Sequence, residues 1–386
     1  NLWHMSSCSS SRLNWGELFN PESWPPKVKP YSARVIQIVK GSGEVKFSAC
    51  KEIVGEGKLP TDPGVAESKK CYEKLALLLK IAVCARISTD ASLSDLCRLS
   101  AVQGLFEWAS IYEPTGNPIN ESRLIPWIQA YDIMKPVLTV QENMSLEKFA
   151  RSLLSANNSF AQKRKLRNCN WTSWRLCIHS MLSTVLGDES SLKSSQELVE
   201  VHIEQNLMED GASFDFLARD ALHYHVYDLD ALLTMAIHVP PAFLSPRSLT
   251  RIERAVAFLE PYFTGAAVHI EFANSPVAFD RRRREAGIEA YQNRPWPPAQ
   301  ARALLRKARV LFPSVEPWTA SVADEQYDAM YKLTLSAMEG RLAAAPPTAA
   351  AAADDGRGAC AASRAEECPM AGAPPGPDAG DPRPGA

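Results

Sequence analysis

Side chains suited to acid–base chemistry or anion binding lie at helical spacing along one predicted helix. Residues 214–236, FDFLARDALHYHVYDLDALLTMA, carry apolar side chains at three- and four-residue spacing, which predicts an amphipathic helix. Arg219, His223, Tyr227 and Asp230 would point nearly the same way on it. A guanidinium holds anions, and an imidazole and a phenol transfer protons. The row therefore indicates a lined cleft; the alternative is an internal hydrogen-bond network.

No metal or cofactor site is predicted. His223 and His225 resemble a metal-binding pair, but side chains two residues apart on a helix diverge by about 200°. The nine cysteines form no CxxC pair, and no Cys/His set has zinc-finger spacing. Most are expected to be buried thiols, with one or two disulfides as the alternative for an exported protein.

Two further segments concentrate polar and aromatic side chains beside predicted helices. Residues 111–121, IYEPTGNPINE, form a loop fixed by two prolines and a glycine, and residues 168–175, NCNWTSWR, begin a helix. Sites often lie on loops and helix starts of a rigid frame. The alternatives are a stiff connector for the first segment and an N-cap role for Asn168 or Asn170 in the second.

Helices must position all three segments. Apolar periodicity, caps and breakers predict helices over residues 69–87, 93–111, 124–134, 145–166, 171–186, 191–207, 214–236, 248–262, 299–311 and 323–343. Residues 264–297 are predicted to be irregular, with arginines 281–284 as a solvated charge cluster. No alternating strand pattern or fixed-period repeat occurs, so the fold class is all-α, as a ring of antiparallel helix hairpins or a bundle.

Composition divides the chain into three parts. Residues 1–67 are rich in Ser, Pro and Gly and predict an irregular N-terminal arm, with at most a short strand over residues 33–39. Residues 68–343 form the predicted helical domain. Residues 344–386 have almost no large apolar side chains, which predicts a disordered tail.

Charge and hydropathy exclude two classes of partner. The net charge is −2, whereas a nucleic-acid-binding protein needs a strongly basic face. No apolar run reaches the length of about 18 residues that a membrane span requires. The opening NLWHMSSCSS has neither an initiating methionine nor a signal-peptide pattern, so we expect the natural N-terminus to lie elsewhere.

Taken together, the segments resemble the alginate lyase superfamily, the polysaccharide lyases built as an incomplete (α/α) toroid. The resemblance covers roughly residues 70–315, and its most specific part is the stretch from Arg219 to Leu229. The motifs that carry it are WASIYEPTGNPINE at 108–121, NWTSW at 170–174, DGASFDF at 210–216, RDALHYHVY at 219–227, EFANS at 271–275 and FDR at 279–281.

The resemblance implies β-elimination on a uronic acid polymer, in which a base removes the C5 proton and an acid protonates the departing O4. It implies Asn170 and Arg219 as donors that neutralise the substrate carboxylate. His223 or His225 would be the base or a charge stabiliser, and Tyr227 the proton donor, with the base as its alternative role. Nearby cations would then lower the pKa of Tyr227.

Further residues are expected to bind the polymer: Tyr112, Asn117, Asn120, Trp171, Trp174 and Tyr224. In characterised alginate lyases a catalytic histidine follows the asparagine, whereas Trp171 follows Asn170 in this chain. Either another histidine takes that role, with His179 and His202 as further candidates, or the substrate or activity differs. Trp108 and Trp127 could stack on sugars or pack in the core.

The predicted function is thus a polysaccharide lyase that cleaves an alginate-like uronate polymer, without a cofactor. The alternatives are a catalytically inactive toroid that binds acidic polysaccharide and an all-helical interaction scaffold. The predicted partner is an acidic polysaccharide, with no nucleic acid and no membrane, and no oligomeric state is predicted. The expected location is extracellular or within the secretory pathway.

Overall fold

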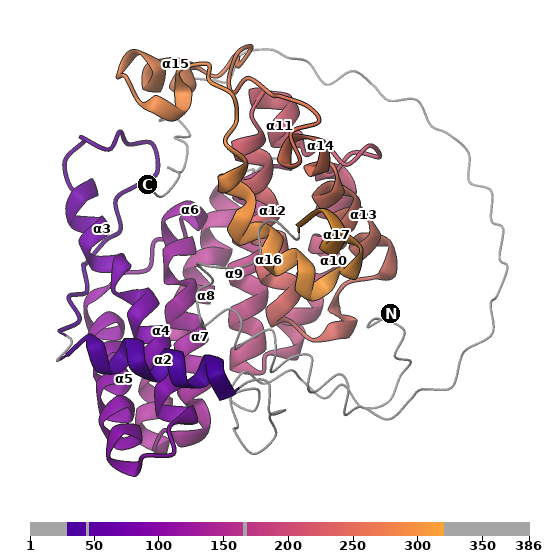
Figure 1. The fold of residues 1–386 in the computed structure, drawn as a ribbon. Helices are drawn as coiled ribbons and strands as arrows, with labels where there is room; N and C mark the ends of the chain where they lie inside the picture. The colour runs from indigo at the N-terminus through magenta and orange to yellow at the C-terminus, as the bar shows by residue number, and fades with distance from the viewer. Residues whose placement is uncertain (1–28, 44–45, 165–167, 320–386) are drawn as a thin grey trace, which may run out of the picture.

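Helices account for nearly all the regular structure of this protein. The structure, a computed structural model, describes residues 29–43, 46–164 and 168–319 (Figure 1). The described ranges contain no strand, which confirms the predicted all-α class. The α-helices are α2 (Lys29–Gly41), α3 (Val65–Glu73), α4 (Leu75–Ile87), α5 (Ala91–Ile111), α6 (Pro118–Glu121), α7 (Ile125–Met134), α8 (Val140–Lys163), α9 (Asn170–Leu186), α10 (Glu189–Asn206), α11 (Phe214–Arg219), α12 (Leu222–His238), α13 (Pro246–Ala257), α14 (Glu260–Phe263), α15 (Ala278–Glu285), α16 (Arg302–Leu311) and α17 (Glu316–Thr319).

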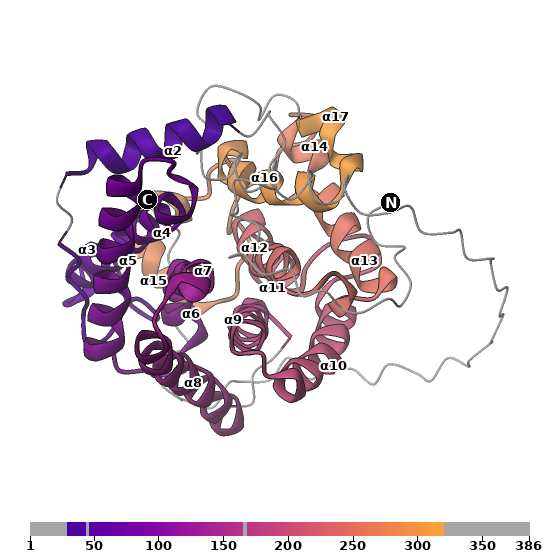
Figure 2. The same ribbon diagram turned by 90° about the horizontal axis from the view of Figure 1, so that it is seen from below.

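The helices form an inner and an outer layer. Every residue of α9 is buried, and most of α7 and α12 is buried as well. Such helices, covered on all sides, must lie inside the domain. Figure 2 shows α7, α9 and α12 inside, with α5, α8, α10 and α13 around them. Consecutive helices such as α8, α9 and α10 pack as antiparallel hairpins, because only short connections join them.

The N-terminal arm contains a helix that the sequence analysis missed. The strand predicted over residues 33–39 is wrong, because α2 occupies this segment. Val35 and Val39 lie one helical turn apart and are both buried, so they form the core-facing side of α2. Phe47 and Ile53, in the non-helical stretch that follows, are also buried. The predicted helix over 323–343 and the tail lie outside the described residues.

Several helix boundaries follow from caps. Helix α8 begins five residues before the predicted position, because Thr139 and Glu142 form a capping box: the Thr139 Oγ1 accepts from the Glu142 N–H at 3.2 Å, and Glu142 Oε2 accepts from the Thr139 N–H at 2.7 Å. Gly187 ends α9 in the left-handed conformation, as predicted. The segment predicted to be irregular contains α15, which carries the arginine cluster.

The helix predicted over residues 214–236 is two helices. Asp220 adopts φ 51°, in the left-handed region, and separates α11 from α12. Aspartate tolerates this conformation, and its carboxylate Oδ2 accepts from the Asn274 N–H at 2.8 Å. The Asp220 carbonyl also accepts from the Phe272 N–H at 2.8 Å. Arg219 therefore does not continue the row formed by His223 and Tyr227, and the predicted three-turn row is wrong.

The loop of residues 112–117 is held by one buried carboxylate and one glycine. Glu121 Oε1 accepts from the N–H groups of Thr115 at 2.7 Å and Gly116 at 2.8 Å. Gly116 adopts φ 73°, and a Cβ there would lie 2.1 Å from the carbonyl oxygen of Ala156 in α8. The loop thus packs directly against the backbone of α8.

Gly116→Ala is expected to lower the free energy of unfolding by about 2–4 kcal/mol, since alanine adds left-handed strain and a backbone clash. Gly265→Ala is the matched control, because Gly265 also has a positive φ, of 82°, but no atom lies within 4 Å of an added Cβ. Gly265→Ala should lower the free energy of unfolding by about 1 kcal/mol, because it adds the left-handed strain without a clash. Equal losses in urea unfolding would contradict the close approach to Ala156.

Candidate active site

Four of the predicted side chains lie on α9 and α12, two inner helices that pack against each other. Asn170 and Trp174 lie one turn apart on α9, and His223 and Tyr227 lie one turn apart on α12. The rings of Trp174 and Tyr227 are in contact, with centroids 5.2 Å apart. We call these four residues the α9–α12 face.

Each residue of the α9–α12 face has a buried polar atom without a hydrogen-bond partner among the described residues. These atoms are Asn170 Oδ1, Trp174 Nε1, His223 Nε2 and Tyr227 Oη. Native proteins leave few buried polar atoms unpaired, and such atoms concentrate where water or a ligand binds. The face therefore offers both donors and acceptors to a bound molecule.

His223 presents a free lone pair. Its Nδ1 lies 3.3 Å from Gln300 Oε1, an acceptor, which assigns the ring proton to Nδ1 and leaves Nε2 unprotonated. Burial lowers the pKa of His223 to about 4, so the imidazole is neutral at pH 7. A neutral imidazole with an unpartnered Nε2 can accept a proton.

Tyr227 presents a proton. Burial raises its pKa to about 12, and this outweighs the opposing effects of the Arg123 charge and of the Ser122 hydroxyl nearby. Ser122 itself donates to the Ile119 carbonyl at 2.8 Å. The predicted lowering of the Tyr227 pKa is therefore wrong, because desolvation of the phenolate exceeds its attraction to cations. At pH 7 the hydroxyl is protonated and can donate.

Asn170 is held by a buried carboxylate. Asp215 accepts from the Asn170 backbone N–H at 2.6 Å and from its Nδ2 at 2.7 Å. Burial raises the pKa of Asp215 to about 6 despite these bonds. The side-chain atom left without a partner is the acceptor Oδ1, which is the opposite of the donor role predicted for Asn170.

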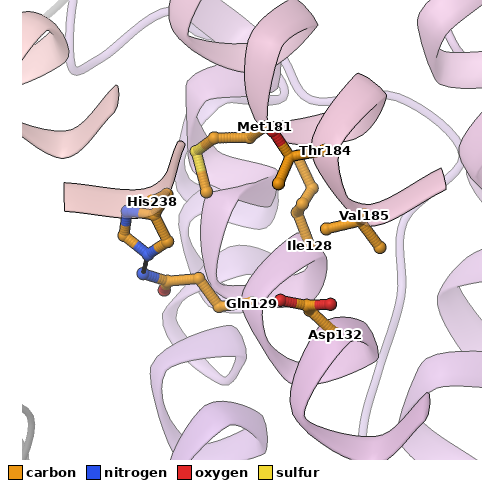
Figure 3. A pocket seen from close by; sticks show the side chains of 7 residues that line it. All are labelled: Ile128, Gln129, Asp132, Met181, Thr184, Val185 and His238. Carbon is orange, nitrogen blue, oxygen red and sulfur yellow. Dashed lines mark hydrogen bonds between the residues drawn. The ribbon is translucent and has the colours of Figure 1, made fainter. Parts of the chain in front are cut away.

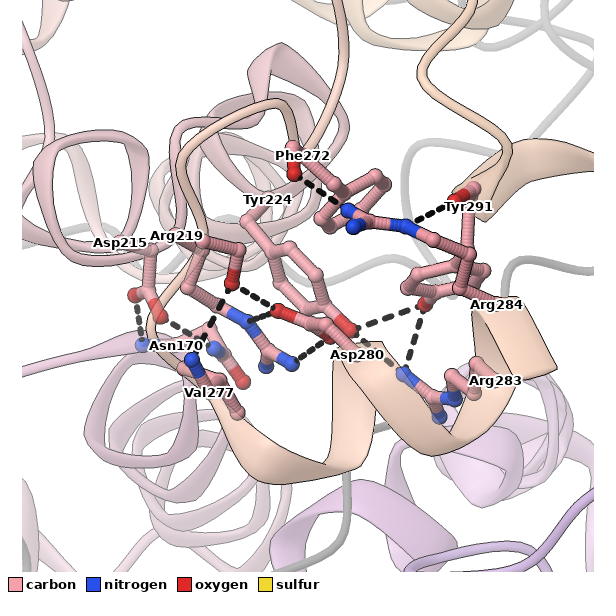
Figure 4. A network of polar contacts seen from close by, with 11 residues as sticks. Asn170, Asp215, Arg219, Tyr224, Phe272, Val277, Asp280, Arg283, Arg284 and Tyr291 are labelled. Atoms are coloured by element: carbon pink, nitrogen blue, oxygen red, sulfur yellow. Dashed lines mark hydrogen bonds and ion pairs between the residues drawn. The ribbon is translucent and has the colours of Figure 1, made fainter.

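Arg219 lies in a buried ion pair with Asp280. Its Nε donates to Asp280 Oδ2 at 3.1 Å, and its terminal nitrogen donates to Asp280 Oδ1 (Figure 4). The guanidinium carbon lies 3.8 Å from the centroid of the Tyr224 ring, a cation–π contact. Because Asp280 already neutralises this charge, the predicted binding of a substrate carboxylate by Arg219 would require competition with Asp280.

A second arginine belongs to the same network and was missed by the sequence analysis. Arg283 is fully buried and donates from one terminal nitrogen to the hydroxyls of Tyr224, at 2.9 Å, and Tyr291, at 2.6 Å (Figure 4). The prediction that arginines 281–284 form a solvated cluster is therefore wrong for Arg283. The available signal was the helical spacing of Phe279 and Arg283, which places both on the buried side of α15.

Tyr224 and His225, both predicted site residues, are held by contacts within the protein. Tyr224 is fully buried, with its ring under Arg219 and its hydroxyl bonded to Arg283. His225 uses both ring nitrogens on backbone groups: Nδ1 accepts from the Ser213 N–H at 3.2 Å, and Nε2 donates to the Ala255 carbonyl at 2.9 Å. The polar atoms of both residues thus have partners inside the protein, and their predicted site roles stay predictions.

The predicted loop residues also serve the loop itself. Asn117 caps α6 by accepting from the N–H groups of Ile119 and Asn120, and its Nδ2 donates to Glu56 at 3.2 Å. Asn120 Oδ1 accepts from the Glu56 N–H at 2.9 Å. The Tyr112 hydroxyl lies 3.4 Å from Glu121, and burial raises the pKa of Tyr112. These contacts join the loop to the N-terminal arm.

The other aromatic and histidine candidates pack inside the protein. Trp171 is stacked on Phe160 of α8, with ring centroids 6.1 Å apart. Trp108 and Trp127 are fully buried. His202 Nε2 is 2.6 Å from the Ser173 hydroxyl, and burial lowers the pKa of His179 to about 4 and that of His202 to about 3. The predicted sugar stacking by Trp171 is corrected, because its ring faces α8.

A buried carboxylate also binds the start of α12. Glu271 accepts from the N–H groups of Leu222 at 2.8 Å and His223 at 3.2 Å, so it sets the first turn that carries the imidazole. Burial raises the pKa of Glu271 to about 8, with a smaller contribution from Asp220. The backbone donors act in the opposite direction but do not offset the burial.

The free energy of unfolding should fall as pH rises from about 6.5 to 8.5. Unfolded Glu271 has lost its proton above its ordinary pKa of 4.5, whereas the folded protein holds it to about pH 8. A raised folded-state pKa stabilises at low pH, and this stabilisation disappears through the folded pKa, at most about 1.4 kcal/mol per pH unit. Urea unfolding of Glu271→Gln should show a shallower slope.

Asp228 contributes the remaining slope, because burial raises its pKa to about 8 as well. The buried histidines titrate below this window, since their pKa values are lowered to about 3 or 4. An unchanged slope in Glu271→Gln would contradict the assignment.

Two small hollows lie beside the inner helices in the described part of the chain. One is lined by the arm and the loop helices, including Tyr72, Asn120 and Arg123, whose guanidinium lies 5.1 Å from the Tyr72 ring centroid. The other lies near the C-terminal ends of α7, α9 and α12 (Figure 3). There Gln129 Nε2 lies 2.6 Å from His238 Nε2, beside Asp132 and Thr184.

In the described part of the chain, no three or more His, Cys, Asp or Glu side chains are placed to hold a metal ion. None of the helices described is long and apolar enough to cross a membrane.

Comparison with known proteins identifies the fold. The alginate lyase family model matches residues 98–267, a segment that contains the whole α9–α12 face. An alginate lyase from Bacteroides ovatus is similar in structure, with a TM-score of 0.54 at 14% identity over 80% of this chain and 93% of that one. Alginate lyase A1-III from Sphingomonas species A1 gives a TM-score of 0.44 at 14% identity over 72% and 92%. No curated protein matches the sequence. The predicted resemblance to the alginate lyase superfamily is confirmed, and the fold is the (α/α) toroid of those enzymes.

Proposed function

We propose that this chain, which carries an alginate lyase domain, is a polysaccharide lyase that cleaves a uronate polymer by β-elimination on the α9–α12 face. One observation supports the proposal most directly: His223 and Tyr227 carry a buried unpartnered lone pair and a buried unpartnered proton one turn apart on α12. β-Elimination needs one group to take a proton and another to give one.

In the proposed reaction, His223 Nε2 takes the proton from C5 of the sugar. The electron pair released forms the C4–C5 double bond as the C4–O4 bond breaks, and the Tyr227 hydroxyl gives its proton to O4. The pKa of His223 is low in the absence of substrate, but a bound uronate carboxylate would raise it toward neutrality by favouring imidazolium. Proton transfer becomes efficient as that pKa approaches the working pH.

Arg123 is the proposed ligand of the substrate carboxylate. It is the cation whose charge acts most on the pKa of Tyr227, and it lines the small hollow that also contains Tyr72 and Asn120. Arg219 is paired with Asp280. Asn170 Oδ1 is free to accept from a sugar hydroxyl.

The proposal is tested by ultraviolet absorbance of the unsaturated uronate that β-elimination produces. Purified protein would be incubated separately with polymannuronate, polyguluronate and polyglucuronate. A rise with one of them supports the lyase and identifies the sugar. Binding without any rise would favour the second candidate, a toroid that holds acidic polysaccharide without cleaving it, for which the observation is Trp171 in place of the family histidine.

His223 and His225, in the first turn of α12, are expected to separate catalysis from stability. His223→Ala should lower kcat by about 10²–10⁴, the usual contribution of general acid–base catalysis, with little change in unfolding. His225→Ala should instead lower stability by roughly 2–4 kcal/mol, since the Ser213 N–H and the Ala255 carbonyl lose their partners. If turnover survives in His223→Ala and disappears in folded His225→Ala, the base is misassigned.

We further propose residues 68–343 as the catalytic domain and an extracellular or secretory location, which fits an acidic polysaccharide as substrate.

A further inference from the structure

The thiols of Cys84 and Cys97 meet inside the N-terminal helix hairpin. Cys84 lies near the end of α4 and Cys97 near the start of α5, and both are almost completely buried. Their sulfur atoms are 3.0 Å apart. A disulfide bond measures about 2.05 Å, so a shift of about 1 Å joins the two atoms.

The hairpin holds these two sulfurs in register. Ser94, one turn before Cys97 on α5, donates from its hydroxyl to the Ala85 carbonyl at 2.8 Å, next to Cys84 on α4. Asp90 caps α5 by accepting from the Leu93 N–H at 3.2 Å, which fixes the turn between the helices. The thiols therefore face each other because the backbone of the hairpin places them there.

We propose that Cys84 and Cys97 form a disulfide that cross-links α4 to α5. The Cys97 thiolate attacks one sulfur of a low-molecular-weight disulfide, and a small thiol leaves. The Cys84 thiolate then attacks Cys97 in the mixed disulfide and expels the second small thiol. The two cysteines lose two electrons and two protons, which the small disulfide gains. The exchange occurs as the hairpin folds, before the pair is covered.

The nearest sulfur distinguishes this pair from the other buried thiol in the inner helices. Cys177, equally buried on α9, has the Met181 sulfur at 3.7 Å as its neighbour, and a thioether cannot form a disulfide. The cross-link is independent of the proposed lyase activity.

Peptide mapping tests the cross-link. Full-length protein refolded with oxidised glutathione would be alkylated under denaturing conditions and digested with trypsin without reduction. Cleavage after Lys80, Arg86 and Arg98 separates residues 81–86 from residues 87–98. The expected result is one joined species, two hydrogen masses lighter than the sum of the two peptides, which separates on reduction. Cys177 should be recovered as an alkylated thiol.

Recovery of both peptides as separate alkylated species would overturn the proposal, as would either cysteine joined to a different one. The midpoint of thermal unfolding should be higher by roughly 5–10 °C in the oxidised than in the reduced protein. Cys84→Ser and Cys97→Ser should each abolish this redox-dependent shift, whereas Cys177→Ser should retain it. If either serine variant fails to fold, the peptide map of the unmodified sequence still decides.

Discussion

Tyr227→Phe is expected to lower kcat on the active polyuronate by about 10²–10⁴, because the departing O4 loses its proton donor. The substitution removes one oxygen and keeps the ring contact with Trp174. The Tyr227 hydroxyl has no hydrogen-bond partner among the described residues, so removing it should cost little stability. Initial rates measured with saturating polymer give kcat, and urea unfolding gives the stability.

Tyr131→Phe is the matched control for this prediction. Tyr131 lies on α7 and is not part of the α9–α12 face. Its hydroxyl donates to Asn143 Oδ1 at 3.0 Å. Its removal should leave kcat unchanged and lower stability by about 1 kcal/mol. A Tyr227→Phe enzyme that turns over at the normal rate would remove Tyr227 from the mechanism.

Asp280→Ala is expected to lower the free energy of unfolding by about 3–5 kcal/mol, because it leaves the buried Arg219 guanidinium without its carboxylate. Ser275 also donates its hydroxyl to Asp280 Oδ2, at 2.6 Å, and would lose that acceptor. The loss should appear in the midpoint of urea unfolding at constant slope.

Two further variants test whether the ion pair causes this loss of stability. Glu204→Ala removes the carboxylate of an exposed ion pair with Arg247 and should cost less than about 1 kcal/mol. The double variant Arg219→Met with Asp280→Ala removes both charges and should recover much of the loss, since the penalty comes from an unpaired buried charge. A double variant as unstable as Asp280→Ala would show that the ion pair is not the cause.

The fold class followed from local patterns. Helices α5, α7, α9 and α10 end within a few residues of their predicted positions, because glycine, proline and capping residues act over short distances. The same rules missed α2, since Pro30, Gly41 and Gly43 around it suggested an irregular segment. What decided its structure was the burial of Val35 and Val39 against the domain, a tertiary effect.

The candidate site was predicted in part. Asn170, Trp174, His223 and Tyr227 were all named from the sequence, and the structure places them on adjoining helices. Which of their polar atoms are hydrogen-bonded could not be predicted, because the partners lie far away in the sequence. Asp215 holds the Asn170 amide from 45 positions away in the sequence, and Gln300 holds the His223 ring from 77 positions away.

The predicted placement of Arg219 in one row with His223 and Tyr227 was wrong for a different reason. Helical periodicity assumes an unbroken helix, but Asp220 adopts the left-handed conformation and ends the helix there. Aspartate is common at such positions but is also found inside helices, so Asp220 gave no decisive signal. The partners that stabilise it, Phe272 and Asn274, come from a segment without a regular pattern.

The break at Asp220 also couples the two helices that it separates. Because the chain changes direction there, the Arg219 guanidinium at the end of α11 lies over the Tyr224 ring of α12, and the Ser213 N–H that precedes α11 bonds to His225. An insertion or deletion within α11 would therefore disturb the first turns of α12 as well. In related proteins, substitutions in these two helices should accumulate together, since neither helix can shift without the other.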